Sequence, residues 1–223
     1  MSEEAKLREE ICVLAKSLFD RGLTCGASGN ISARLSDGTL LMTPTGSSMG
    51  FLDPSRISHL DANLQLLSGD RPTKEIPLHT AFYDTRNGTG AVVHLHSTHS
   101  VAVSMLPETD PDNALPPLTP YSVMRLGRIK LLPVFLPGDA AMGDAVRGLA
   151  GQRTAVLLAN HGPVVAGRDL WAAVFAMEEL EETAKLTLLT RGLKPSVLTI
   201  EEVRAVNKMG QRGTVNLNGS GRE

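Results

Sequence analysis

The sequence predicts a single α/β domain built on a central, largely antiparallel sheet. Three observations favour this fold class. The chain has 223 residues, a length closer to one large domain than to two independent ones. Its apolar residues recur with the period of a helix in some segments and of a strand in others, so both elements are expected. Several strand patterns follow one another closely, with helices interspersed among them, which favours antiparallel pairing.

The first half of the chain is expected to contain two strand pairs, a further strand and three helices. Residues 3–21 place apolar side chains along one helical face, and Gly22 ends this helix. Asp37-Gly38 predicts a hairpin turn, because both residues tolerate a positive φ. Pro77 falls in the first turn of a later helix, where its missing N–H costs little. The expected elements are a helix over 3–21, strands over 31–35, 40–43, 57–61 and 64–67, a helix over 75–86, a strand over 91–96 and a short helix over about 99–105.

The second half continues the mixture of strands and helices and ends in a polar segment. Five prolines over 107–120 predict an irregular loop. Thr199 and Glu202 form the capping box of a last short helix. The Gly-rich segment 210–223 is expected to be a flexible tail, so the folded domain is predicted to span 1–209. The other expected elements are strands over 129–135 and 154–158, a sharp turn over 160–163, and helices over 139–149 and 169–191.

Composition excludes several function classes. Lys and Arg number 22 against 24 Asp and Glu, a net charge of −2, which argues against the broad basic surface needed for non-specific nucleic-acid binding. Two cysteines cannot form a disulfide framework, and the charged amino terminus does not resemble a secretory signal. No apolar run approaches the roughly 20 residues that span a bilayer. We therefore expect a cytoplasmic protein without nucleic-acid or membrane partners.

Histidines two positions apart in an apolar strand predict a metal site. The side chains of His94 and His96 point to the same face, while Leu95 enters the opposite core. Two buried imidazoles are costly unless something uses their nitrogens, which favours a metal over a pair of core histidines. Catalytic zinc needs a third protein ligand, and His161 after the strand over 154–158 is the candidate, although it could instead be an ordinary turn residue. His99 is the competitor, but it begins a helix and is expected to face elsewhere.

Glu75 is the candidate acid or base of the site. It opens a helix, where a carboxylate is usually a favourable partner of the helix dipole, and that remains the default interpretation. The functional alternative is a carboxylate beside the metal, with a pKa tuned by partial burial and a neighbouring cation. Two further histidines, His59 and His79, have the pattern of surface or core residues.

Three polar clusters at turns or helix starts could together bind one phosphate. They span 26–30, 43–48 and 73–74, and each offers backbone N–H and hydroxyl groups to an anion. Singly they are ordinary turns, and the sequence has no Walker or dinucleotide fingerprint. Lys74 would supply the fixed positive charge. The predicted phosphate ligands are Asn30, Thr45, Gly46, Thr73 and Lys74.

Taken together, these motifs resemble the class II aldolase/adducin family over nearly the whole chain, from the first helix to about Leu198. The motifs are SGNIS at 28–32, TPTG at 43–46, TKE at 73–75, HLHSTHS at 94–100 and ANHGP at 159–163. The resemblance implies a three-layer α/β/α domain, a homotetramer and active sites at subunit interfaces. It also implies Zn²⁺, or another divalent metal, on His94, His96 and His161, with Glu75 beside the metal and able to bind it when substrate is absent.

Within the family, the details are most similar to decarboxylases of phosphorylated 3-oxo sugar acids. The similar segments include GDRPTKE, TPYSVMRLG and LANHGPVV. Such a substrate would lose CO₂ to leave a metal-stabilised enediolate, which Glu75 would protonate, or else Tyr121 from a neighbouring subunit. A packing role for Tyr121 is an equal alternative.

Other functions remain open at this stage. Phosphosugar aldolases of the fuculose-phosphate type match less well, because they carry a small hydroxyl residue where this chain has Lys74 and have a tyrosine segment near the carboxyl terminus that this chain lacks. A related epimerase or dehydratase is a further alternative. A non-catalytic, adducin-like interaction module is an alternative from another class, but the three metal-type histidines and Glu75 favour an enzyme.

Overall fold

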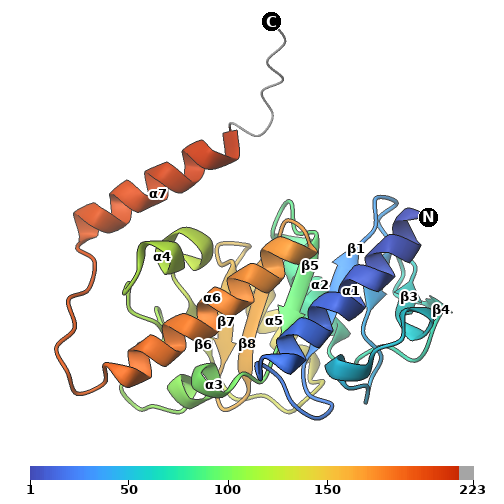
Figure 1. The fold of residues 1–223 in the computed structure, drawn as a ribbon, viewed down its shortest axis with the longest axis horizontal. Helices are drawn as coiled ribbons and strands as arrows, with labels where there is room; N and C mark the ends of the chain where they lie inside the picture. Colours follow the sequence, from blue (N-terminus) through green and yellow to red (C-terminus); the bar gives the residue numbers. More distant parts are fainter. Residues whose placement is uncertain (216–223) are drawn as a thin grey trace, which may run out of the picture.

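A computed structural model describes residues 1–215 as an eight-stranded sheet between two layers of helices (Figure 1). The strand order is β4-β3-β2-β1-β5-β8-β7-β6, and the pairing is antiparallel except between β6 and β7. The strands are β1 Asn30–Arg34, β2 Leu40–Met42, β3 Ser58–Leu60, β4 Leu66–Ser68, β5 Ala91–His94, β6 Lys130–Leu132, β7 Ala155–Leu158 and β8 Gly162–Gly167. The predicted three-layer α/β/α fold with a mainly antiparallel sheet is confirmed.

Helices α1, α3 and α6 cover one face of the sheet, and α2 and α5 cover the other (Figure 1). The helices are α1 Glu3–Asp20, α2 Ile76–Thr85, α3 Thr98–Ser104, α4 Pro120–Leu126, α5 Ala140–Arg147, α6 Leu170–Leu189 and α7 Ile200–Val215, with short 3₁₀ helices η1 Met49–Phe51 and η2 Pro54–Arg56. Side-chain oxygens cap the long helices, since Ser2 accepts from Ala5 N and Asp169 accepts from Ala172 N.

Neighbouring residues of each central strand enter different cores. In β5, Val93 packs in the core beneath α1 and α6, whereas Val92 packs in the core beneath α2 and α5. This alternation follows from the two-residue period of a strand. It sends the odd-numbered residues of β5, and Leu95 after it, toward α1 and α6, and leaves His94 on the side of α2. The sheet therefore presents its histidines to the layer that carries Glu75.

Three expectations about the elements were wrong. β8 is a central strand between β5 and β7, although the sequence predicts only a turn at its start. Its run of buried residues shows no polar alternation, and the turn residues at 160–163 concealed where it begins. Helix α4 follows directly on the proline-rich loop and was not predicted, because its start is itself a proline. The strands over 91–96 and 129–135 end at His94 and Leu132.

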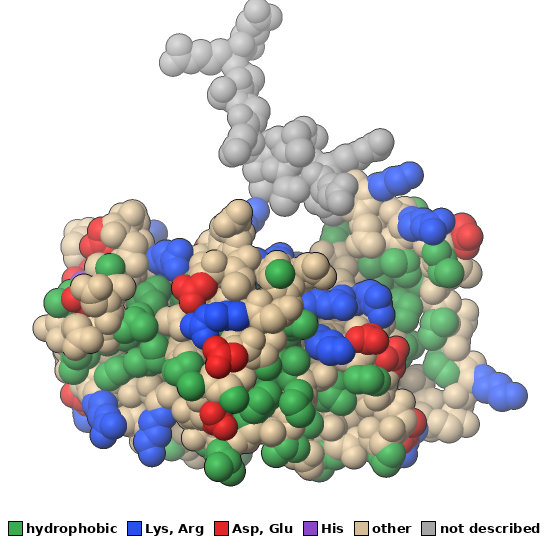
Figure 2. All heavy atoms as spheres, turned by 180° about the vertical axis from the view of Figure 1, so that it is seen from behind, with side chains coloured by type: hydrophobic (Ala, Val, Ile, Leu, Met, Phe, Trp, Pro, Cys, Tyr) green, Lys and Arg blue, Asp and Glu red, His purple; other side chains and the backbone are tan. Residues whose placement is uncertain are grey.

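The carboxyl-terminal helix extends past the predicted domain boundary. Helix α7 packs against α4 and runs from Ile200 to Val215, so it continues beyond 209. Residues 216–223 lie outside the described part of the chain, and the flexibility expected of 210–223 stays a prediction. None of the helices in the described residues is long and apolar enough to cross a membrane. Lys and Arg side chains alternate with Asp and Glu side chains over the face seen in Figure 2.

Candidate active site

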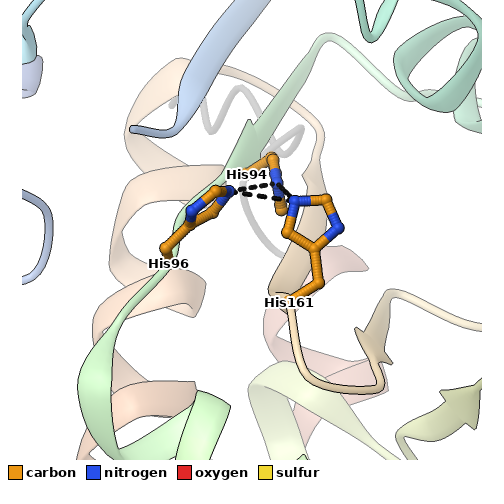
Figure 3. Close-up of side chains that lie close together, drawn as sticks. All are labelled: His94, His96 and His161. Atoms are coloured by element: carbon orange, nitrogen blue, oxygen red, sulfur yellow. Dashed lines mark hydrogen bonds between the residues drawn. The ribbon is translucent and has the colours of Figure 1, made fainter. Parts of the chain in front are cut away.

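Three imidazoles converge at the end of β5 (Figure 3). The Nε2 atoms of His94 and His96 lie 3.2 Å apart, those of His94 and His161 3.3 Å, and those of His96 and His161 3.0 Å. Ligand nitrogens about 2 Å from a tetrahedral ion lie about 3.3 Å from one another. The three nitrogens therefore form a tripod with the dimensions of a divalent-metal site.

The end of β5 and the loop after it position His94 and His96. His94 is the last residue of the strand and is paired with Asn30 of β1. His96 lies just beyond the strand, so the expectation that both belong to it was wrong for His96. Residues 95 and 96 nevertheless continue to point to opposite sides of the sheet, because Leu95 N donates to Pro163 O and keeps this stretch paired with β8. Leu95 is buried in the opposite core, as predicted.

The tight connection between β7 and β8 positions His161. Asn160 has a φ of 56°, which reverses the chain after β7. Gly162 has a φ of 153°, and a Cβ built there would lie 2.1 Å from Leu95 O. Only glycine allows β8 to approach β5 this closely. The glycine after His161 therefore brings the third imidazole against the other two.

The protonation state of His94 suits a metal ligand. Its Nδ1 donates to Pro163 O over 2.9 Å, so its Nε2 carries the lone pair that faces the other two rings. Burial lowers the pKa of His94 to about 3, and the ring is neutral at pH 7. Burial also lowers the pKa of His96, with His161 acting in the same direction. Neutral imidazoles are the form that binds a divalent metal.

Glu75 lies beside the three histidines. It is the N-cap residue of α2, but its side chain caps no backbone N–H and turns toward the imidazoles. Its Oε2 lies 3.4 Å from His94 Nε2, and its Oε1 lies 3.6 Å from His161 Nε2. Asn30 Nδ2 donates to Oε2 over 2.7 Å. The carboxylate is therefore close enough to act as a fourth ligand or as an acid or base at the metal.

Opposing effects set the pKa of Glu75. Burial is the largest single effect and raises it, but His94, the hydrogen bond from Asn30, His161 and His79 together lower it by more. The net result is a pKa below the usual range for a glutamic acid. Glu75 is thus ionised at pH 7 while it remains largely shielded from water.

A cavity of about 200 Å³ opens in front of the histidines and Glu75. Two backbone hydrogen bonds join the loops that form it, from Thr45 N to Arg71 O and from Thr73 N to Thr43 O. The lining residues are Ala27, Ser28, Gly29, Asn30, Pro44, Thr45, Gly46, Thr73, Lys74, Glu75, His96, Pro137, Gly138 and His161. Every residue predicted to bind phosphate therefore lines the same cavity as His96 and His161, and Lys74 is the only Lys or Arg in this lining.

Tyr121 is the one predicted site residue that belongs neither to the histidine tripod nor to the lining of this cavity. It is on α4, its side chain is 60% exposed, and it is absent from the cavity lining. His99 points away from the site, as expected, because its Nδ1 lies 2.8 Å from Glu181 Oε1. His59 is half-buried at the other end of the sheet and lies 2.9 Å from Thr39 Oγ1.

Sequence reasoning missed the role of His79 in the site. This side chain is fully buried on α2, one turn after Glu75, and its Nε2 is hydrogen-bonded to Asn30 Oδ1. The signal available in the sequence was the four-residue spacing from Glu75, which places both side chains on one helical face. Pro137 and Gly138 were also not predicted, and they bring the loop before α5 to the cavity.

Comparison with known proteins shows the family to which the chain belongs. Residues 9–188 match the model of the Class II Aldolase and Adducin N-terminal domain. The chain belongs to the class II aldolase and adducin family. The match spans both the histidines of the tripod and the loops around the cavity.

Members of the family with a named activity are similar over most of their length. A 3-oxo-tetronate 4-phosphate decarboxylase from Escherichia coli K12 is 48% identical over 90% of this chain and 94% of its own. An L-fuculose phosphate aldolase from Methanococcus maripaludis is 34% identical over 83% of this chain and 98% of its own. The crystal structure of YgbL from Escherichia coli superposes with a TM-score of 0.90 at 46% identity, covering 92% of this chain and all of that one. These similarities identify the chain as a lyase of the class II aldolase family.

Proposed function

We propose that the protein decarboxylates 3-oxo-tetronate 4-phosphate to dihydroxyacetone phosphate and CO₂. The observation that carries the proposal is the 48% identity to the decarboxylase from Escherichia coli over nine-tenths of this chain. The site supports it independently. It combines a histidine tripod, a shielded carboxylate and a cavity lined by Lys74 and polar loops within one small region. A phosphorylated sugar acid that chelates a metal would use all three parts.

The tripod of His94, His96 and His161 would hold the metal, for which we propose zinc. A divalent cation bound there would supply the positive charge that accommodates the electron pair released with CO₂. The spacing of the three Nε2 atoms and the neutral state of His94 support this assignment. The hydrogen bond from His94 to Pro163 O fixes the orientation of that ring before any metal binds.

The phosphate of the substrate would lie in the part of the cavity formed by the polar loops. Lys74 offers a cation, Thr45 and Thr73 offer hydroxyl groups, and Gly46 offers its backbone N–H. A Cβ built on Gly46 would meet nothing within 4 Å, so the backbone there is open to a ligand. Asn30 has one N–H committed to Glu75 and one left for the phosphate.

Decarboxylation breaks the bond between C1 and C2, and the electron pair passes to the C2–C3 enediolate. Protonation at C2 then gives dihydroxyacetone phosphate, so an acid must reach that carbon. We assign this step to Glu75, which lies beside the tripod and within the cavity lining. Glu75 would first have to acquire this proton from solvent, because the loss of CO₂ from the carboxylate consumes one proton overall. Tyr121 could take this role only in the site of a neighbouring subunit.

A homotetramer with sites at subunit interfaces and a cytoplasmic location remain part of the proposal. The exposed position of Tyr121 on α4 is compatible with an interface role. Sedimentation analysis at several protein concentrations tests the tetramer. A monomer that retains full activity would contradict the shared site and exclude Tyr121 as the proton donor.

A ketose-1-phosphate aldolase is the second candidate, favoured by the 34% identity to the fuculose phosphate aldolase. Both reactions would use the positive charge of a cation held by His94, His96 and His161, so the fold and the tripod do not distinguish them. A related epimerase or dehydratase would use the same parts. A non-catalytic module would bind phosphate or metal without turnover.

The deciding experiment compares substrates on one metal-loaded preparation. We expect release of CO₂ from 3-oxo-tetronate 4-phosphate, with much slower cleavage of fuculose 1-phosphate and ribulose 1-phosphate in kcat/KM. Exchange of a C–H of dihydroxyacetone phosphate with deuterated water would report formation of the enediolate. Faster cleavage of either ketose phosphate would replace the decarboxylase assignment with the aldolase. No turnover of any member of the panel would favour the interaction module.

A further inference from the structure

A line of buried polar side chains runs between α2 and β1 and ends at Glu75. On α2, Glu75, His79 and Tyr83 are four residues apart and share one helical face. On β1, Asn30 and Ser32 are two residues apart and face that helix. The residues interdigitate, since Asn30 contacts both Glu75 and His79, and Ser32 contacts both His79 and Tyr83.

The chemistry of the groups fixes the direction of the hydrogen bonds nearest the site. Asn30 Nδ2 donates to the Glu75 carboxylate over 2.7 Å, so the amide oxygen of Asn30 faces His79. That oxygen can only accept, and the Nε2 of His79 must therefore carry the proton that it donates. In a neutral ring, Nδ1 then accepts from Ser32 Oγ over 2.7 Å. Ser32 in turn lies 2.9 Å from the Tyr83 hydroxyl. The donors all point toward Glu75.

These hydrogen bonds allow the side-chain amide of Asn30 only one stable orientation. A flipped amide would set its oxygen against the Glu75 carboxylate and its NH₂ against the N–H of His79. Both contacts would be repulsive in a region where Ser32 and His79 are fully buried. The burial of His79 lowers its pKa to about 4, which keeps the ring in the neutral form that the pattern requires.

We propose that His79 is a positioning residue, which acts through the Asn30 amide to hold the Glu75 carboxylate in its orientation beside the histidine tripod. The role of Glu75 in protonation is part of the proposed function, and the inference rests on it to that extent. His79 lines no part of the cavity and does not touch the tripod. Its effect on the reaction must therefore pass through Asn30.

Two matched variants test the proposal on the metal-loaded enzyme. In His79→Gln the amide N–H can take the place of Nε2 and donate to Asn30, whereas in His79→Asn the shorter side chain can meet Ser32 but does not reach Asn30. We expect His79→Asn to lower kcat by about 10- to 100-fold with little change in KM or metal content. His79→Gln should stay within about threefold of the wild-type kcat. Equal losses in both variants would overturn the proposal, and so would a wild-type kcat in His79→Asn.

A double-mutant cycle separates positioning from a general structural role. If His79 acts through Asn30, His79→Asn should cause little further loss of kcat once Asn30→Ala has removed the amide. A purely structural contribution would instead lower kcat by the same factor in both backgrounds. Additive effects of the two substitutions would therefore contradict the inference.

NMR of the zinc-loaded protein with ¹⁵N-labelled histidine gives a measurement that does not depend on the reaction. The wild type should show a neutral His79 ring protonated at Nε2, with an N–H protected from exchange that is lost in His79→Gln and perturbed in Asn30→Ala. A ring protonated at Nδ1 alone would refute the proposed hydrogen-bond direction. If the wild type has this signal but no decarboxylase activity, the proposed function fails while the hydrogen-bond assignment stands. If the wild type is an active decarboxylase but the effects of His79→Asn and Asn30→Ala on kcat are additive, the positioning role of His79 fails while the proposed function stands.

Discussion

Replacement of His79 by Gln should reduce the pH dependence of the protein's stability by a predictable amount. The pKa of His79 falls from an ordinary value of 6.5 to about 4 in the folded chain because the ring is buried. Between these values the unfolded chain binds more protons than the folded one, so the free energy of unfolding decreases as the pH falls. His79 thus contributes stability that is fully present above about pH 6.5 and is lost on acidification. Between pH 8 and pH 5 the loss is about 2 kcal/mol, at 1.36 kcal/mol for each pKa unit.

Urea unfolding at pH 8 and pH 5 measures this contribution. Both the wild type and His79→Gln should be measured without metal, in the presence of a chelator, so that metal binding does not add its own pH dependence. His79→Gln keeps a donor toward Asn30 but cannot titrate. The difference in unfolding free energy between the two proteins should therefore shift by about 2 kcal/mol in favour of the variant at pH 5. A shift below about 0.5 kcal/mol would show that the buried ring does not resist protonation, and it would refute the reasoning.

Three further predictions concern the site itself. His96→Ala should lose both bound metal and activity, measured by elemental analysis and turnover, whereas His59→Ala should lose neither; equal effects would contradict the tripod. Glu75→Gln should keep the fold and the metal but lower kcat by about 10²- to 10⁴-fold, because an amide cannot donate a proton to carbon; a change below about tenfold with metal intact would move the acid elsewhere. Lys74→Met should chiefly raise KM, and inorganic phosphate should compete with substrate for the wild type; neither effect would be seen if the phosphate lay outside the cavity.

Short-range patterns of apolar and turn residues in the sequence were sufficient to predict many of the helices and strands. The apolar face of α1, the Asp37-Gly38 turn after β1 and the apolar run of β5 are features of residues close together in the chain, which is why these elements were predicted near their observed positions. The two-residue period of a strand put His94 and His96 on one side of the sheet, although His96 lies past the end of the strand. β8 was missed because its first residues, Gly162 and Pro163, are typical of the turn that was predicted there.

The sequence proposed the residue types of the candidate site, and packing decided which of these residues meet. The spacing of His94 and His96 indicated a metal, and the polar clusters indicated an anion, because these properties belong to short segments. The approach of His161 depends on β8 pairing with β5, and the sequence left a simple turn histidine as an alternative. The partnership of His79 with Asn30 joins residues 49 positions apart in the chain. Sequence pattern alone left His79 as either a surface or a core residue. Only the packing of α2 on β1 decides which groups meet its two nitrogens, because hydrogen-bond partners are fixed by the positions of atoms in space and not by separation along the chain.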